Sequence, residues 1–212
     1  ASAGDRPNLA AAPARPQPGR SWRADEGDSL ESIAETLSPD NPAKQRRLVA
    51  PGQASSDLAA DAGRRAIERA GLSPDDIDAV ICATVTPDMP LPSCAVLVQR
   101  KVGITRNIPS FDLSAACGGF LYGLAVAEGL IRGGQIRRIL LCGVEVLSRC
   151  VDWSDRNTCI LFGDGAGAVV LGPAEPGGSA GLISTHLFAD GSLADALCIP
   201  AGGSLRGATA ET

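Results

Sequence analysis

The pattern of apolar and polar positions changes near residue 48, and from there apolar runs alternate with periodic, half-polar stretches. Three runs are mostly apolar: 78–85, 108–113 and 138–146. Such near-continuous apolar runs are typical of strands in a parallel sheet that is covered on both faces. Apolar residues three or four positions apart predict three helices: 57–70, 94–102 and 120–131. Two final runs, 166–171 and 182–187, predict another pair of strands. The alternation predicts an α/β fold in which a mostly parallel sheet carries helices on both faces.

Residues that begin and end helices support these boundaries. Ser55 or Ser56 can cap the first helix, and Gly71 and Gly103 can end the first and second helices. The apolar positions of the first helix fall on one face: Leu58, Ala62, Ala66 and Ala70.

The beginning of the chain lacks this organisation. Residues 1–20 are rich in alanine, proline and arginine without periodicity, which is typical of disorder. One amphipathic stretch, 28–37, can form a turn or two of helix before Pro39. We therefore expect the folded part of the chain to begin near residue 47.

Composition and charge argue against several classes of protein. The 212 residues carry a formal net charge of −5 without a basic stripe, so we expect no nucleic-acid partner. No apolar run approaches the roughly 20 residues that span a membrane. The seven cysteines form no C-x-x-C pair and no metal-ligand spacing, and their odd number is unlike a disulfide framework. With no secretory apolar segment, these features predict a cytoplasmic protein without a metal site.

The stretch 108–132 places one cysteine at a chemically distinctive position. An apolar run leads into small residues at 114–119 and then into a helix, so a strand is predicted to turn sharply into a helix. Cys117 then lies at or just before the first helical turn, where unpaired N–H groups and the helix dipole favour a thiolate. A backbone N–H beside the sulfur can also donate to an oxyanion. Two interpretations remain open: a nucleophile, or a buried structural cysteine.

Other residues invite a chemical interpretation. The glycine-rich run 163–168 leads into strand residues, whereas a dinucleotide fingerprint opens a helix, so no nucleotide loop is predicted. Asp164 is either catalytic or turn-stabilising, and the second role is commoner. His186 is the only histidine, but its apolar strand-like surroundings are typical of a structural residue. Cys82 and Cys142 lie inside apolar runs and are predicted to be core residues.

Three separated segments resemble one family, the β-ketoacyl-acyl carrier protein synthases III: 111–120, 155–171 and 181–192. The resemblance runs from about Arg47 to the C-terminus and covers only the N-terminal half of the family. It implies a thiolase-like fold, of which this chain forms one half. Residues 1–46 match nothing in the family and are expected to be disordered or of misread sequence, so we divide the chain into 1–46 and 47–212.

The resemblance also implies roles for individual residues. Cys117 matches the family's acyl-accepting position. Arg156 matches a residue that packs against the adenine of coenzyme A, where a guanidinium can stack and pair with phosphate; a solvated loop arginine is the alternative. Leu91 matches a usually aromatic position that closes the starter-acyl pocket of the partner subunit in a homodimer. The family's catalytic His and Asn lie in its second half, which supports a structural role for His186.

The activity implied by the resemblance is the first condensation of fatty acid synthesis. A starter acyl-coenzyme A acylates the cysteine, and malonyl-acyl carrier protein then condenses with the acyl group as it loses carbon dioxide. Acyl-coenzyme A enters as a substrate, and no other cofactor is implied. Because the second half is missing, we expect an incomplete form of the enzyme. The alternatives are a starter-loading or ester-forming acyltransferase of secondary metabolism and a non-catalytic interaction fragment.

Overall fold

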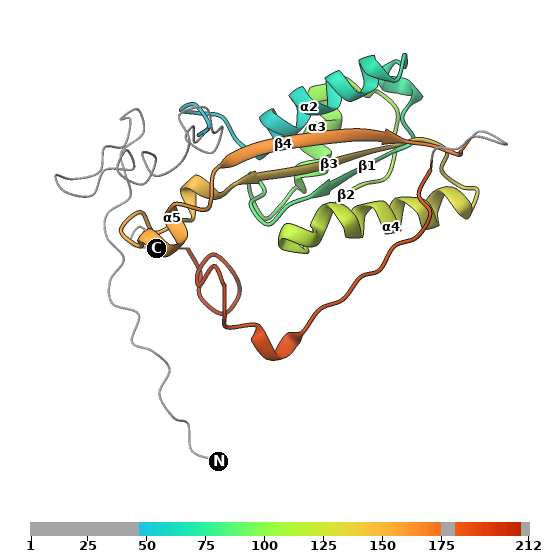
Figure 1. Cartoon of the computed structure of the whole chain (residues 1–212). Coiled ribbons are helices and arrows are strands. Elements are labelled where there is room, and N and C mark those ends of the chain that lie inside the picture. The colour runs from blue at the N-terminus through green and yellow to red at the C-terminus, as the bar shows by residue number, and fades with distance from the viewer. Residues whose placement is uncertain (1–46, 175–180, 209–212) are drawn as a thin grey trace, which may run out of the picture. The chain divides into compact units, whose positions relative to one another are not determined.

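The computed structural model describes residues 47–174 and 181–208, which divide into two units. The larger unit comprises 47–148, 163–174 and 181–188, and the smaller comprises 149–162 and 189–208. The segment 1–46, expected to be disordered or misread, and the helical turns predicted at 28–37 lie outside the described residues. Figure 1 shows the helices and strands: α2 (Ser55–Arg69), β1 (Ala79–Ala83), α3 (Cys94–Val102), β2 (Ser110–Leu113), α4 (Gly119–Arg132), β3 (Ile139–Val146), α5 (Arg156–Cys159) and β4 (Asp164–Leu171).

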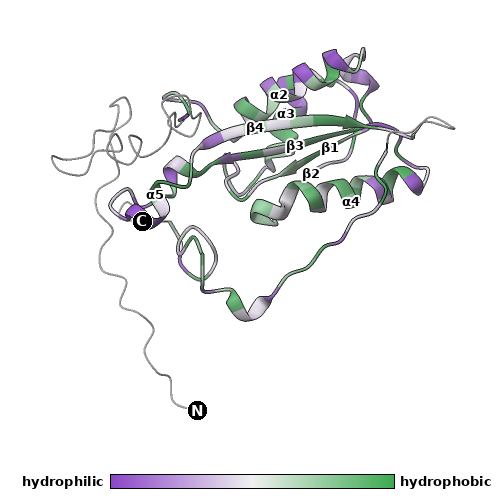
Figure 2. Cartoon of the chain, in the orientation of Figure 1, coloured by the Kyte–Doolittle hydropathy of each residue, from purple (hydrophilic) through white to green (hydrophobic). Residues whose placement is uncertain are grey.

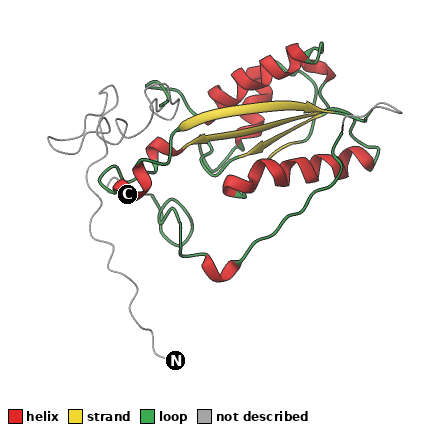
Figure 3. Cartoon of the chain, in the orientation of Figure 1, coloured by secondary structure: helices red, strands yellow, loops and turns green. Residues whose placement is uncertain are grey.

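The four strands form one mixed sheet in the order β2-β1-β3-β4 (Figure 3). β1 runs parallel to both β2 and β3, and β4 pairs with β3 in the antiparallel direction. In this register Cys82 of β1 is the partner of Cys142 of β3. The prediction of a mostly parallel sheet is confirmed, with one antiparallel edge strand.

Helices cover both faces of the sheet, as the sequence predicted. Side chains alternate between the faces of a strand, so Val80 and Leu140 pack toward α2 and α3, whereas Ile81 and Leu141 pack toward α4. Figure 1 shows α2 and α3 on one side of the sheet and α4 on the other. All four side chains are fully buried, and burying one of this size contributes about 1.5–3 kcal/mol. Figure 2 shows the resulting apolar interior of β1 and β3. Burial on both faces explains why these strands are continuous apolar runs.

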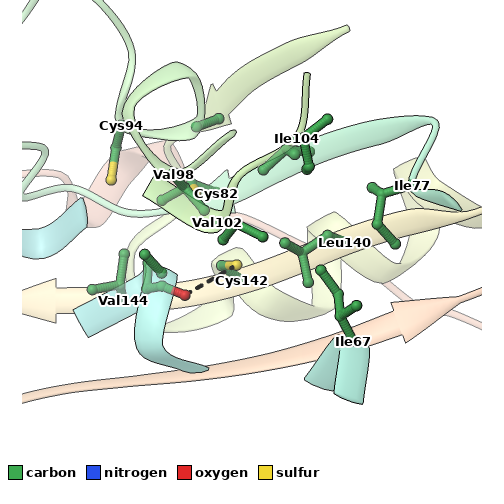
Figure 4. Close-up of a cluster of buried hydrophobic side chains, with 14 residues drawn as sticks. Ile67, Ile77, Cys82, Cys94, Val98, Val102, Ile104, Leu140, Cys142 and Val144 are labelled. Carbon is green, nitrogen blue, oxygen red and sulfur yellow. Dashed lines mark hydrogen bonds between the residues drawn. The ribbon is translucent and has the colours of Figure 1, made fainter. Parts of the chain in front are cut away.

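Three cysteines belong to the core on the side of α2 and α3 (Figure 4). Cys82, Cys94 and Cys142 are fully buried, and the Cys142 thiol lies 3.9 Å from the carbonyl oxygen of Ala59. Contact with the thiols of Cys142 and Cys94, together with burial, raises the pKa of Cys82 far above its ordinary value. The prediction that Cys82 and Cys142 are core residues is confirmed.

The start and the inward face of α2 differ from the prediction. The N-cap is Ala54, whose N–H donates to Asp57 Oδ2 at 2.9 Å, so the proposed cap at Ser55 or Ser56 is wrong. Both serines are buried inside the helix, because their hydroxyls bond to the loop after β1. The buried face is also one position away from the predicted one and contains Ala59, Ala60, Gly63 and Ile67. Gly63 permits this rotation, because a Cβ there would lie only 3.1 Å from Leu140 Cδ2.

The strand predicted at 182–187 is wrong. The segment forms no helix or strand and is largely exposed (Figure 3). Ile183, for example, is 97% exposed. An apolar run becomes a strand only when a neighbour accepts and donates its backbone hydrogen bonds, and no described strand pairs with this one. The strand at 166–171 is confirmed as part of β4.

Candidate functional site

The parallel strands β1, β2 and β3 end at the same edge of the sheet, where open α/β sheets bind their ligands. The turn after β2 carries Cys117. This turn leads into α4, whose first residue packs over the end of β1: a Cβ at Gly119 would lie 3.2 Å from Ala83 Cβ. The lack of a side chain at Gly119 therefore brings the cysteine turn close to the carboxyl end of the neighbouring strand.

Cys117 lies in a single 3₁₀ turn, Ala116–Gly118, between β2 and α4. Its side chain is exposed, unlike the three cysteines of the core, so the structural-cysteine interpretation fails on burial. Ala116 has a φ of +45°, in the left-handed region that residues other than glycine rarely adopt, and such strain clusters at functional sites. The predicted sharp passage from strand to helix is confirmed. The geometry suits a nucleophile presented at the start of a helix.

Two acidic residues to which the sequence pattern assigned no role hold this edge together. Asp112, on β2, accepts hydrogen bonds from the first N–H groups of α3: Cys94 N at 2.7 Å and Ala95 N at 2.8 Å. Glu145, on β3, accepts from Val85 N at 2.9 Å, in the loop after β1. The signal available in the sequence was a carboxylate inside an otherwise apolar strand, which needs a partner when it is buried.

Leu91 lies in the loop between β1 and α3 and is 84% exposed. Asp88 attaches this loop to α2, because its carboxylate accepts from Ser56 N at 2.8 Å and from Ser56 Oγ at 2.6 Å. Lys101 of α3 donates to the same Ser56 Oγ at 2.6 Å. The loop is therefore tied to α2, which Lys101 links to α3, and it presents Leu91 outward. Its role toward a partner subunit stays a prediction.

Arg156 belongs to the smaller unit, where it is the first residue of α5 and is exposed. Asp155 caps this short helix through Asn157 N at 3.0 Å. The hydroxyl of Thr158 and the N–H of Asn157 hold the pKa of Asp155 below its ordinary value. The predicted contact of Arg156 with coenzyme A stays a prediction.

Asp164 has a structural role, which is the commoner of the two roles considered from the sequence. Its carboxylate accepts from Val49 N at 2.8 Å, Ser148 N at 2.9 Å and Ser148 Oγ at 2.6 Å. The glycine-rich run that begins there forms β4, so the expectation of no nucleotide loop agrees with the fold. His186 lies in the segment that does not form a strand and is exposed, so its predicted apolar surroundings are wrong.

Residues 47–174 and 181–208 contain neither a metal-binding cluster nor a membrane-spanning helix. No group of three or more His, Cys, Asp or Glu side chains there could hold a metal ion. Within the same ranges, none of the helices combines the length and apolar composition that crossing a membrane requires.

An exposed cysteine at a strained strand–helix turn on the edge of an α/β sheet has the geometry that suits a nucleophile. Residues 111–191 match the sequence model of the family 3-oxoacyl-[acyl-carrier-protein (ACP)] synthase III. The chain is 50% identical over 169 residues to a β-ketoacyl-[acyl-carrier-protein] synthase III of Caldanaerobacter subterraneus, covering 80% of this chain and 50% of that protein. The chain thus spans about half the length of the curated relatives it matches.

Solved structures agree with this relationship. The 3-oxoacyl-[acyl-carrier-protein] synthase III of Aquifex aeolicus superposes with a TM-score of 0.60 at 40% identity, over 70% of this chain and 46% of that one. The priming β-ketosynthase of the R1128 polyketide biosynthetic pathway gives a TM-score of 0.62 at 31% identity, over 79% and 53%. The resemblance carried by the motifs is confirmed: the chain matches the N-terminal half of the β-ketoacyl-acyl carrier protein synthase III family and shares its thiolase-like α/β fold.

Proposed function

We propose that the protein is an acyltransferase of fatty acid synthesis initiation that carries its acyl group on Cys117. The observation that carries the proposal is the exposed thiol in the turn between β2 and α4, inside the segment that matches the synthase family. An exposed sulfur at the start of a helix can reach a thioester, whereas the buried core cysteines cannot.

The first step is transfer of the acyl group to the sulfur. The Cys117 thiolate attacks the carbonyl carbon of a starter acyl-coenzyme A, and a new carbon–sulfur bond forms. Negative charge moves to the carbonyl oxygen, where a backbone N–H beside Cys117 at the start of α4 would donate. The tetrahedral intermediate then collapses, coenzyme A leaves as a thiolate, and the acyl group stays on Cys117 as a thioester. The covalent intermediate divides the reaction into two easier steps.

The second step is decarboxylative condensation. Malonyl-acyl carrier protein loses carbon dioxide, and the resulting carbanion attacks the thioester carbon and releases the Cys117 thiolate. The resemblance places the His and Asn that stabilise this carbanion in the half of the family that the chain does not span. We therefore expect the 212-residue chain to acylate itself slowly and to condense at a rate close to background. Losing one oxyanion donor costs about 10²–10³ in rate, and losing general acid–base groups about 10²–10⁴ more.

Further features of the proposal come from the resemblance. Arg156 would contact the adenine of coenzyme A, and Leu91 would close the acyl pocket of a partner subunit in a homodimer. Leucine is smaller than the aromatic residue usual in the family, so it leaves a differently shaped pocket. The enzyme would work in the cytoplasm with acyl-coenzyme A as substrate and no further cofactor.

The test incubates the chain with acetyl-coenzyme A and locates the added acetyl group by peptide mass spectrometry. Acetylation of Cys117, absent from a Cys117→Ala variant, is the expected result. Malonyl-acyl carrier protein is then added, and little ketoacyl product is expected. Absence of acetyl-Cys117 would contradict the proposal, and ketoacyl product at an ordinary turnover rate would show that a base lies within this chain.

A second candidate is a starter-loading acyltransferase of secondary metabolism. The structural similarity to a priming β-ketosynthase of a polyketide pathway supports it. Both candidates share the acylation of Cys117 and differ in the acceptor. Offering acetyl-Cys117 enzyme a panel of carrier proteins and alcohols separates them, since only the secondary-metabolism enzyme would transfer the acyl group to an acceptor without decarboxylation.

A further inference from the structure

Glu145 is a carboxylate on an otherwise apolar strand, close to the cysteine turn. Side chains of β3 alternate between faces, so Glu145 shares the face of Leu141, which α4 covers. Gly143 lies between them on that face and is covered by the start of α4, because a Cβ there would lie 3.3 Å from Phe120 Cδ2. Glu145 therefore lies at the carboxyl end of β3, two residues beyond the contact with the first turn of α4.

The carboxylate of Glu145 joins the ends of β1 and β3. It accepts from Val85 N at 2.9 Å and from Thr86 Oγ1 at 2.5 Å. Thr86 Oγ1 in turn accepts from Val146 N at 2.8 Å, so it bridges the carboxylate and the strand end. Hydrogen bonds to an ionised group are about twice as strong as neutral ones, and this site is partly buried, with Thr86 and Val146 shielded from water. The loop after β1 is thus held firmly against β3.

The same loop holds the strand from which the cysteine turn departs. Thr84 N donates to Leu113 O at 3.1 Å, and Leu113 is the last residue of β2. Cys117 follows four positions later. Hydrogen bonds therefore run from Glu145 through the loop 84–86 to the base of the cysteine turn.

We propose that Glu145 is a positioning residue for Cys117: its carboxylate fixes the loop after β1, and that loop fixes the end of β2 so that the thiol stays at the start of α4. The proposal rests on the proposed role of Cys117 as nucleophile. The positioning role differs from a contribution to stability alone, because it makes the reactivity of the exposed Cys117 thiol depend on a carboxylate on another strand.

A matched control lies at the opposite edge of the sheet. Asp78, just before β1, also accepts two backbone hydrogen bonds, from Arg137 N at 3.2 Å and Arg138 N at 3.0 Å, and it pairs with Arg106 at 3.0 Å. An Asp78→Ala variant loses comparable bonds, but far along the strand from the cysteine turn. It separates lost stability from lost positioning.

The experiment labels the full chain with iodoacetamide at neutral pH and follows each cysteine by mass spectrometry. The measured quantity is the labelling rate of Cys117 divided by that of Cys198, another exposed cysteine. Glu145→Ala is expected to lower this ratio about two- to fivefold, the effect of losing a helix N-terminus on a charged group. Glu145→Gln keeps an acceptor for the loop and should restore most of the ratio. Asp78→Ala should leave it unchanged.

Other results would overturn the proposal: equal ratios for Glu145→Ala and the unaltered chain, or an equal fall in Asp78→Ala. If Glu145→Ala does not fold, the buried cysteines become labelled, and Thr86→Val then carries the test with the same expectation, because it removes the bridging hydroxyl. Labelling needs no acyl-coenzyme A. A failed acetylation of Cys117 with the expected iodoacetamide ratios would therefore defeat the proposed function and leave the positioning role intact.

Discussion

Two glycines of α4 allow a sharp test of how this helix packs behind the cysteine turn. A Cβ at Gly123 would lie 2.5 Å from Leu141 Cδ1 and 3.3 Å from its Cδ2, whereas a Cβ at Gly129 would meet nothing within 4 Å. Leu141 is fully buried and has little room to move. The same substitution, glycine to alanine, therefore meets opposite surroundings on one helix.

The magnitudes separate the two variants. Alanine inside a helix is favoured over glycine by about 0.5–1 kcal/mol, so Gly129→Ala should stabilise the fold by that amount. Gly123→Ala gains the same term but overpacks the contact with Leu141, which costs about 1–3 kcal/mol. The helix term cancels between the variants, so Gly123→Ala should be less stable than Gly129→Ala by about 1–3 kcal/mol.

Labelling of the buried thiols measures this difference without requiring reversible refolding. Cys82 and Cys142 are fully buried, so in native buffer they react only when the fold opens. A difference of that size corresponds to a labelling rate about 5- to 150-fold higher in Gly123→Ala than in Gly129→Ala. Equal labelling rates in the two variants would refute the close packing of α4 on β3.

Three further predictions follow from single contacts. Asp112→Asn leaves one acceptor for two N–H groups of α3 and should destabilise the fold by about 1.5–3 kcal/mol, measured as a lower denaturation midpoint; an unchanged midpoint would contradict its role as the anchor of α3. Cys117 should react with iodoacetamide faster than any core cysteine, and equal rates by mass spectrometry would contradict its exposure. The hydrogen bond from Lys101, followed by that from Ala54 N, lowers the pKa of Asp57 in the folded chain. The ionised Asp57 carboxylate therefore stabilises the fold at pH values above the unfolded pKa of about 3.9. This stabilisation is lost as the pH falls from about 3.9 toward the lower folded pKa. Asp57→Asn should therefore flatten the acid side of a stability–pH curve measured by denaturation midpoints, and an unaltered slope would count against this linkage.

Much of the fold could be predicted, because its signals are local. The observed helix α3 has the bounds predicted for it, 94–102, because Ser93 caps its start and Gly103, with a φ of +93°, ends it. The buried strands were visible as apolar runs because both of their faces are covered. The strand–turn–helix around Cys117 was likewise visible as small residues between an apolar run and a periodic stretch.

The sequence by itself determined which segments become buried strands and helices and which thiol lies at the strand–helix turn, since period, capping and residue size act over a few positions. Only the tertiary structure decided what depends on distant partners. The face of α2 that turns inward follows from its approach to Leu140, and the segment 182–187 forms no strand because no neighbour pairs with it. Asp112 and Glu145 find their bonds 17 or more positions away, and no local pattern encodes such a distance.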